Sequence, residues 1–480
     1  MKLPDFSPLV EELPATLRAE DIFARMCRLP HCLFLDSALG DPLLGRYSFL
    51  AADPFDYIEI AADAADGEIA ADAADGLARL AKLISRFRVP SLVGLPPFQG
   101  GAAGVFGYEL GRSLEELPRP AFDEFQFPAM AVGLYDLVVA MDHVDNRAWI
   151  ISQGLPETDP PRRRQRAARR VAQMQEWLAA QCTDTAVEPP GFPSVDIDSL
   201  APEFPVPGPD GLMSNFSAEG YLRAVGRIIE YIHAGDVFQV NLSQRLLFPA
   251  DRDTPALYLR LRNCNPAPFA GYFDLGKFQI ASASPERFLQ VRGDKVETRP
   301  IKGTRQRVDC PQTDRRSERE LRQSEKDTAE NVMIVDLLRN DLSRVCRPES
   351  VEVSQLCEVE RYEHVLHLVS AVCGRLRREC SPLDLVRASF PGGSITGAPK
   401  PRAMEIIAEL EPTARGAYCG SLGYLGFDGS MDLNILIRTI TAGRGWWQAP
   451  VGGGIVAQSD PQQEYEETWH KAEGLLRALR

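Results

Sequence analysis

Two spacings of apolar residues divide the chain into helices and strands. Between 216 and 235 they fall at Tyr221, Val225, Ile228, Ile229 and Ile232, the spacing of an amphipathic helix. Further helices are predicted at 161–181, at 328–345 and from Pro461 onward. Short apolar runs predict strands at 33–35, 47–51, 132–141, 148–152, 279–284, 288–291, 420–427 and 433–441. Long strands beside long helices, without strict βαβ alternation, favour an α+β fold.

A proline-rich stretch at 183–211 separates an N-terminal region, 1–182, from a C-terminal region, 212–480. This stretch has seven prolines, six acidic residues, no basic residue and no helical period, so we interpret it as a linker or surface strap. Ile60–Gly67 repeats as Ile69–Gly76, which we interpret as a duplication in a surface loop. The arginine-rich helix before the linker is interpreted as a solvated face, since no aromatic residues interleave with the arginines.

The charge balance restricts the partners. The chain has 53 basic and 67 acidic residues, a net charge of −14, which argues against nucleic acid or an anionic membrane surface as the main partner. No apolar run is long enough to span a bilayer, and the ten cysteines form no CxxC pair. We therefore expect a cytoplasmic protein with reduced thiols. Only eight of the 53 basic residues are lysines, so a lysine near a glycine turn is a weak pointer to function.

Two helices present carboxylates at helical spacing. After the capping sequence Ser459-Asp460-Pro461, Glu464, Glu467 and Lys471 fall on one face, while Asp327 and Glu330 lie one turn apart at the start of another helix. For either helix taken alone, a polar face exposed to solvent would explain this spacing of charged residues. Carboxylates delivered from two helices also suit Mg²⁺, which takes oxygen ligands and keeps positions open for an anionic substrate. The sequence therefore predicts a magnesium site, provided that the two helices meet.

Other segments could hold an anion or act as a nucleophile. Ser394 and Thr396 precede a helix that opens near Pro399, and helix N-termini bind anions. Arg438 stands in an alternating, half-buried run, where a guanidinium usually has a carboxylate partner, internal or bound. Lys302 adjoins the turn Gly303-Thr304, and neighbouring arginines would lower its pKa and make the amine nucleophilic. A surface role is the plain alternative for each of them.

The motifs PIKGT (300–304), ENVMIVDLLRNDL (330–342), HLVS (367–370), PGGSITGAPK (391–400), GGGIVAQSDP (452–461) and EYEETWHKA (464–472) occur in this order. The series resembles the chorismate-utilising enzymes, which include anthranilate synthase component I, the isochorismate and salicylate synthases and aminodeoxychorismate synthase component I. The resemblance covers about 213–475 and extends more loosely into the N-terminal region. It implies a large antiparallel β-sandwich with helices packed outside, to which both regions contribute strands.

Two positions distinguish the members of this family. Lys302 resembles the aminating member, in which this lysine is thought to attack C2 of chorismate; the others typically have alanine here. Isochorismate and salicylate synthases place a lysine where this chain has Gln239, and glutamine cannot act as the base for water. The resemblance therefore implies amination of chorismate to 4-amino-4-deoxychorismate for p-aminobenzoate and folate synthesis. The alternatives are anthranilate synthase component I, which also releases pyruvate, and a non-catalytic paralogue that binds chorismate or tryptophan.

The resemblance also assigns site residues. It implies that Glu330 and Glu467 bind Mg²⁺ with support from Glu464 and Asp327, and that Glu286 is the general acid. It implies a substrate site formed by Gln239, Thr304, His367, Thr396, Arg438, Gly452, Gly453, Gly454 and Lys471. Related enzymes can bind tryptophan near the segments that match Asp36, Ser37, Tyr47 and Ser48.

A source of ammonia is also required. The segment around Cys419 lacks both outer glycines of a glutaminase G-x-C-x-G turn, so we expect a separate glutamine amidotransferase subunit.

Overall fold

A computed structural model describes residues 6–41, 44–62, 69–180, 194–250, 252–307, 311–361 and 365–479. Its strands form two large sheets whose strand pairs are antiparallel. The 13-stranded sheet, called sheet A here, has the order β1 (Leu9–Leu13), β8 (Arg147–Ser152), β7 (Leu137–Asp142), β3 (Tyr47–Ala51), β2 (Leu33–Asp36), β12 (Phe269–Asp274), β13 (Phe278–Ser284), β22 (Thr439–Gly443), β23 (Trp446–Ile455), β11 (Gln239–Pro249), β10 (Met213–Ser214) and β9 (Phe204–Pro205), with β19 (Gly397–Ala398) paired to β11.

The 10-stranded sheet is called sheet B. Its order is β16 (Ile301–Gln306), β18 (Val365–Arg375), β15 (Lys295–Thr298), β14 (Arg287–Arg292), β21 (Met431–Asn434), β20 (Ser421–Gly426), β5 (Gly101–Phe106), β6 (Met130–Tyr135) and β4 (Asp56–Ile60), with β17 (Glu352–Arg361) paired to β18. Both sheets combine strands from the N-terminal and the C-terminal region, as the predicted α+β sandwich requires.

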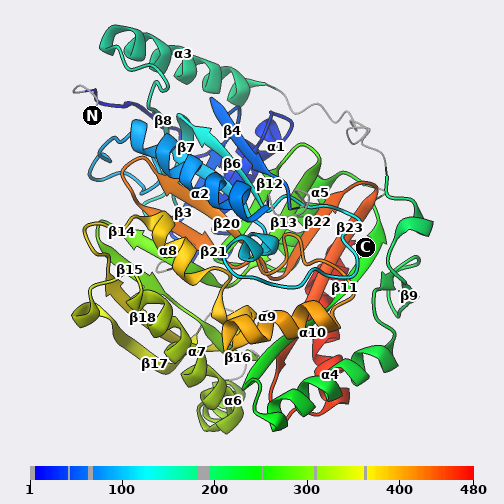
Figure 1. The fold of residues 1–480 in the computed structure, drawn as a ribbon. Helices are drawn as coiled ribbons and strands as arrows, with labels where there is room; N and C mark the ends of the chain where they lie inside the picture. The colour runs from blue at the N-terminus through cyan, green and yellow to red at the C-terminus, as the bar shows by residue number, and fades with distance from the viewer. Residues whose placement is uncertain are drawn as a thin grey trace.

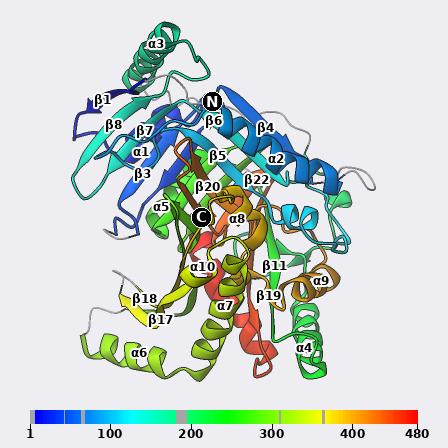
Figure 2. The ribbon, with the colours of Figure 1, turned by 60° about the vertical axis from the view of Figure 1, so that its left-hand side comes forward.

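Helices surround the two sheets (Figures 1 and 2), with α3 at one end of the molecule and α6 at the other. They are α1 (Ala19–Met26), α2 (Ile69–Arg86), α3 (Pro160–Ala179), α4 (Ala218–Ala234), α5 (Thr254–Cys264), α6 (Pro311–Gln323), α7 (Glu325–Ser343), α8 (Pro382–Ser389), α9 (Lys400–Leu410) and α10 (Pro461–Leu479). Short 3₁₀ helices are η1 (Tyr108–Ser113), η2 (Ile197–Ser199), η3 (Pro348–Ser350) and η4 (Gly393–Ile395). No helix in the described part is long and apolar enough to cross a membrane.

The central core lies between the facing sheets. Phe49, Val138 and Ile280 of sheet A pack in one buried cluster with Val105 and Tyr424 of sheet B. The alternation of side chains along each strand sends the next residues outward, where the helices cover them. For example, Leu338 of α7 is buried against sheet B and Leu475 of α10 against sheet A.

Two runs predicted as single strands each change sheet in the middle. The run 132–141 divides at Asp136 into β6 of sheet B and β7 of sheet A. The run 433–441 divides into β21 of sheet B and β22 of sheet A, and Arg438, in the intervening segment, has a φ of 53°. The prediction of continuous strands was wrong because alternation shows which face is buried and not which sheet the strand joins.

Two surface interpretations also needed correction. The second repeat copy, Ile69–Gly76, forms the start of α2 instead of a loop, and most of the first copy lies outside the described residues. In α3 the arginines do not all face solvent. Arg163 is 1% exposed and donates to the Gln153 carbonyl, while Arg170 pairs with the buried Asp136 at the change of sheet. Part of the charge run is therefore internal.

The described part of the predicted linker, 194–211, lies along the C-terminal region. Its strand β9 pairs with β10, and the Val195 amide donates to the Arg444 carbonyl. Glu203 shares the buried Arg245 with Glu124, at 2.6 and 2.7 Å. This arrangement is that of a strap fixed to the surface of sheet A.

Candidate active site

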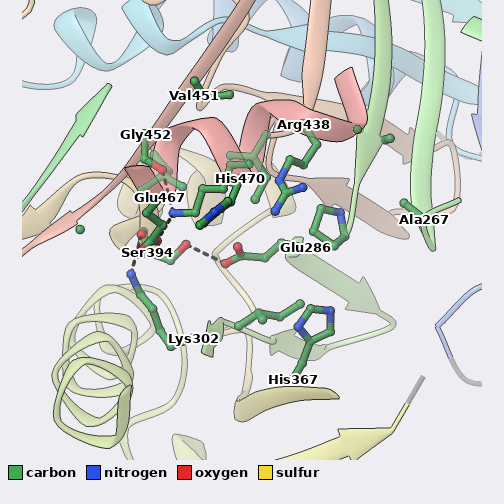
Figure 3. A pocket seen from close by; sticks show the side chains of 18 of the residues that line it. Ala267, Glu286, Lys302, His367, Ser394, Arg438, Val451, Gly452, Glu467 and His470 are labelled. Atoms are coloured by element: carbon green, nitrogen blue, oxygen red, sulfur yellow. Dashed lines mark hydrogen bonds and ion pairs between the residues drawn. The ribbon is translucent and has the colours of Figure 1, made fainter. Parts of the chain in front are cut away.

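A cavity of about 980 Å³ is lined by both sheets and by two helices. Strands β11 and β23 of sheet A contribute Asn241 and Gly452, and β16 and β18 of sheet B contribute Lys302 and His367. α7 contributes Lys326, Asp327 and Glu330 near its start, and α10 contributes residues from Glu467 onward. The two acidic helices predicted from the sequence therefore meet at one cavity, and Figure 3 shows Lys302 and His367 across it from Glu467 of α10.

Lys302 enters the cavity from a bulge in the pairing of β16 with β18. The bulge depends on Gly303, because its φ of 73° favours glycine. A Cβ atom added at this position would also lie only 2.9 Å from the Asp327 carboxyl carbon. The Lys302 side chain is 12% exposed, and its Nζ lies 3.4 Å from the Ser394 carbonyl and 3.7 Å from Glu330 Oε2. The Lys302 side chain therefore points into the cavity, and its terminal amine contacts the Ser394 carbonyl and the Glu330 carboxylate.

The neighbouring arginines each have a carboxylate partner. Arg299 pairs with Glu360, Arg305 lies 3.6 Å from Asp327, and Arg307 lies 2.9 Å from Asp314. The closest charged partner of Lys302 is instead the Glu330 carboxylate. The sequence could not show that each arginine has a carboxylate of its own, and activation of Lys302 by neighbouring cations stays a prediction.

Glu286 follows β13 and points into the same cavity (Figure 3). Glu286 is 4% exposed, and its Oε1 accepts a hydrogen bond from Ser394 Oγ at 2.7 Å. Burial raises the pKa of Glu286 to about 7, against the opposing effects of the Ser394 hydrogen bond and the Lys302 charge. A carboxyl group that changes protonation near neutral pH is suited to general acid chemistry.

The four carboxylates predicted to bind metal also line or adjoin the cavity. Burial raises the pKa of Glu330. Burial acts in the same direction on Glu467, but Lys471, 2.7 Å away, together with Lys326 and Lys302 outweighs burial, and the pKa is lowered. Glu464 is 4% exposed and accepts from Lys326 at 2.9 Å and from Ser459 at 2.6 Å.

These donors are hard oxygen ligands, which fits magnesium chemically. However, no three Asp, Glu, His or Cys side chains of the described residues are already gathered closely enough to hold a metal ion. Lysines stand between the carboxylates, and magnesium binding stays a prediction.

Arg438 and His367 form the polar wall at the end of the cavity that holds Glu286 (Figure 3). Burial lowers the pKa of Arg438, and none of the described residues gives its guanidinium a hydrogen bond or an ion pair. Burial, and then the Arg438 charge, lower the pKa of His367 to about 4, so the imidazole is neutral at neutral pH. An uncompensated guanidinium that faces a cavity is suited to bind a carboxylate of a ligand.

The glycine run of β23 passes along the cavity. A Cβ on Gly452 would lie 2.3 Å from the Leu242 carbonyl of the paired strand, and one on Gly453 would face Lys471 and Glu464 at 3.4 and 3.5 Å. Lys471 donates to the Gly452 carbonyl at 2.8 Å. Close packing against β11 therefore requires glycine at 452, whereas a Cβ at 453 would make only ordinary contacts with α10.

Two predicted substrate residues do not line the cavity, and a third, Thr304, is described only by its backbone. Gln239 is fully buried and is not part of the cavity wall; its amide lies against Gly454, where an added Cβ would be 2.0 Å from Nε2. The Thr396 hydroxyl donates to the Gly392 carbonyl at 3.0 Å, so this side chain closes its own turn and the neighbouring Ser394 faces the cavity. Thr304 pairs with His367 through its backbone, and its side chain lies outside the described residues.

The segments predicted to bind tryptophan form a buried network in sheet A. Asp36 accepts from Arg262 Nε at 2.7 Å and from the Tyr258 hydroxyl at 2.9 Å. Ser48 donates to Asp36 and accepts from the Ser37 amide, and the Ser37 hydroxyl donates to the Tyr47 carbonyl. The four predicted residues are thus brought together, and tryptophan binding stays a prediction.

Sequence reasoning missed two roles. Ser394 was noted only as a member of an anion seat, but it connects Glu286 and Lys302, because its hydroxyl donates to the Glu286 carboxylate and its carbonyl lies beside the Lys302 amine. Lys326 was not considered, although three of the eight lysines, Lys302, Lys326 and Lys471, line this cavity. The rarity of lysine was the signal that could have found it.

The sequence and the fold of this chain are similar to those of known proteins. The model of a family described as chorismate binding enzyme matches residues 36–477. This chain belongs to that family.

Among curated relatives, aminodeoxychorismate synthase component 1 of Escherichia coli is 39% identical over 466 residues, which cover 96% of each chain. Anthranilate synthase component 1 of Thermus thermophilus is 42% identical over 385 residues, which cover 80% of this chain and 78% of the relative. The crystal structure of anthranilate synthase component I from Streptococcus pneumoniae is similar to this chorismate-binding enzyme with a TM-score of 0.74 and 30% identity, over 91% of this chain and 93% of the other. The E. coli menaquinone-specific isochorismate synthase shares the fold, with a TM-score of 0.69 and 17% identity over 100% and 97% of the two chains.

Proposed function

We propose that this chorismate-binding enzyme aminates chorismate at C4 and forms 4-amino-4-deoxychorismate. The observation that supports this proposal is the position of Lys302, whose amine enters the same cavity as the buried, protonatable Glu286. Ser394 connects the two groups. Relatives named aminodeoxychorismate synthase component 1 match along nearly the whole chain.

The reaction would proceed in two displacement steps, one at C2 and one at C4 of chorismate. Lys302 first releases a proton to solvent; its amine then attacks C2 of chorismate, the ring double bond shifts, and the C4 hydroxyl leaves as water with a proton from Glu286. Ammonia then attacks C4, the double bond shifts back, and the lysine leaves C2 as the free amine. Each step forms one C–N bond; the first breaks a C–O bond and the second breaks the C–N bond to the enzyme.

The substrate is a dianion, and the cavity offers cationic groups for it. Arg438, which forms no hydrogen-bonded ion pair with the described residues, and the glycine backbone of β23 would hold carboxylate groups. Glu330 and Glu467, supported by Glu464 and Asp327, would hold Mg²⁺. When bound, the metal would supply positive charge beside the ring carboxylate.

The ammonia would come from a separate glutamine amidotransferase subunit. Burial raises the pKa of the Cys419 thiol to about 12, which makes this cysteine a poor nucleophile for glutamine hydrolysis. The product would then enter p-aminobenzoate and folate synthesis.

Anthranilate synthesis is the second candidate, because a relative with that name is 42% identical. In that reaction nitrogen is added at C2 and pyruvate is released. Lys302 favours the first candidate, since an amine that occupies C2 directs ammonia to C4. A non-catalytic paralogue is not favoured by a cavity that contains both reactive groups.

The test uses the purified chain with ammonium chloride, Mg²⁺ and chorismate, without a partner subunit. We expect 4-amino-4-deoxychorismate and no anthranilate on chromatography. Without ammonia, the intact mass should increase by that of chorismate less one water. Lys302→Ala should lose this adduct, and Lys295→Ala, at an exposed lysine of β15, should retain it. Anthranilate as the main product would support the second candidate, and an unchanged Lys302→Ala variant would exclude the covalent route.

A further inference from the structure

Lys326 connects the two acidic helices from the edge of the cavity. It belongs to the first turn of α7, and its Nζ lies 2.9 Å from Glu464 Oε1 in the first turn of α10. The same oxygen accepts from Ser459 at 2.6 Å. The Glu464 side chain is 4% exposed, so in this arrangement the lysine is the counter-ion of a buried carboxylate.

Each of the other predicted metal carboxylates also has a cationic partner. Lys302 lies 3.7 Å from Glu330, and Lys471 lies 2.7 Å from Glu467. The fourth carboxylate, Asp327, has Arg305 at 3.6 Å. A divalent cation that binds among these groups must therefore replace at least one protein cation, since added positive charge is otherwise repelled.

The three lysines differ in how easily they can withdraw. The Lys302 side chain is 12% exposed and also lies beside the Ser394 carbonyl, and Lys471 is 30% exposed and also donates to the Gly452 carbonyl. Lys326 is 44% exposed, and Glu464 is its only hydrogen-bond partner in the part of the chain that the structure describes. Its flexible stem can carry the ammonium into solvent at the loss of one contact.

We propose that Lys326 is a displaceable counter-ion of the metal site. Its ammonium neutralises Glu464 when no divalent cation is bound and moves into solvent when the cation enters. This inference rests on the magnesium site of the proposed function, but it does not depend on which product is made. Lys326 therefore lowers the metal affinity of the free enzyme and protects the carboxylates from mutual repulsion.

Direct metal binding tests the proposal. Mn²⁺, a probe with similar oxygen ligands, is titrated into the full chain, and the free ion is measured by electron paramagnetic resonance. Lys326→Met keeps the length of the side chain and removes its charge. A partly exposed ion pair contributes up to about 1 kcal/mol, so we expect the Mn²⁺ dissociation constant to fall about fivefold. Lys326→Arg, which keeps the charge, should bind Mn²⁺ as the wild type does.

The matched control is Lys295→Met, which removes one exposed positive charge away from the cavity. Its Mn²⁺ affinity should not change. Equal affinities of Lys326→Met and the wild type, or the same gain in Lys295→Met, would overturn the proposal while the metal site remained. If neither the wild type nor Lys326→Met bound Mn²⁺ at millimolar concentration, both this proposal and the magnesium site would be wrong.

Discussion

Removal of the Ser394 hydroxyl should change the pH at which Glu286 loses its proton. In the structure this hydroxyl donates to Glu286 Oε1 at 2.7 Å, and it opposes the effect of burial on the pKa. The contact between Lys302 and residue 394 is to the backbone carbonyl, so Ser394→Ala leaves it in place. The substitution therefore changes one hydrogen bond of Glu286, the proposed general acid, and leaves Lys302, the proposed nucleophile, in place.

The size of the effect follows from that hydrogen bond. A hydrogen bond to a charged group contributes about 1.5–3 kcal/mol. One pKa unit corresponds to about 1.4 kcal/mol, so loss of the bond should raise the pKa of Glu286 by about one to two units above its value of about 7. A general acid acts in its protonated form. The decline in rate at high pH should therefore shift upward by about one to two pH units.

The assay is chorismate consumption against pH, with saturating ammonium chloride and Mg²⁺. The free ammonia concentration also rises with pH, so variants are compared only at the same pH. Ser389→Ala is the matched control, because Ser389 is fully buried, lies outside the cavity and has a side-chain oxygen without a partner among the described residues. Its profile should follow the wild type. If Ser394→Ala also followed the wild type, Ser394 would not tune the acid.

Three other outcomes are expected. Glu286→Gln should stabilise the protein at pH 8 by about 3 kcal/mol and not at pH 4, because a carboxyl pKa raised from 4.5 to about 7 opposes folding increasingly between these values; urea unfolding at both pH values measures this. Gln239→Lys should destabilise the fold by about 3–5 kcal/mol, since it buries an unpaired amine beside Gly454; urea unfolding measures this, and unchanged stability would contradict the buried position. Lys400→Met should cost about 3–5 kcal/mol because it leaves the buried Asp341 unpaired, and Lys400→Met with Asp341→Leu should recover much of the loss in thermal unfolding.

The local pattern of the chain determined most of its elements. The amphipathic spacing before Gly235 gave α4, and the capping sequence at Ser459-Asp460-Pro461 gave the start of α10. These signals are local, because an apolar face and a capped end depend on residues within a few positions of each other. The same is true of the ordered motifs, which were sufficient to identify the family.

The tertiary structure alone decided how these elements combine. It divided two predicted strands between the sheets, because the choice of sheet depends on partners far along the chain. It placed Lys326 against Glu464, 138 residues away, and gave Lys302 a carboxylate neighbour. It also turned the Thr396 hydroxyl onto its own backbone and directed Ser394 to Glu286. Charge partners and side-chain directions of this kind are set by packing between distant segments, which no local pattern records.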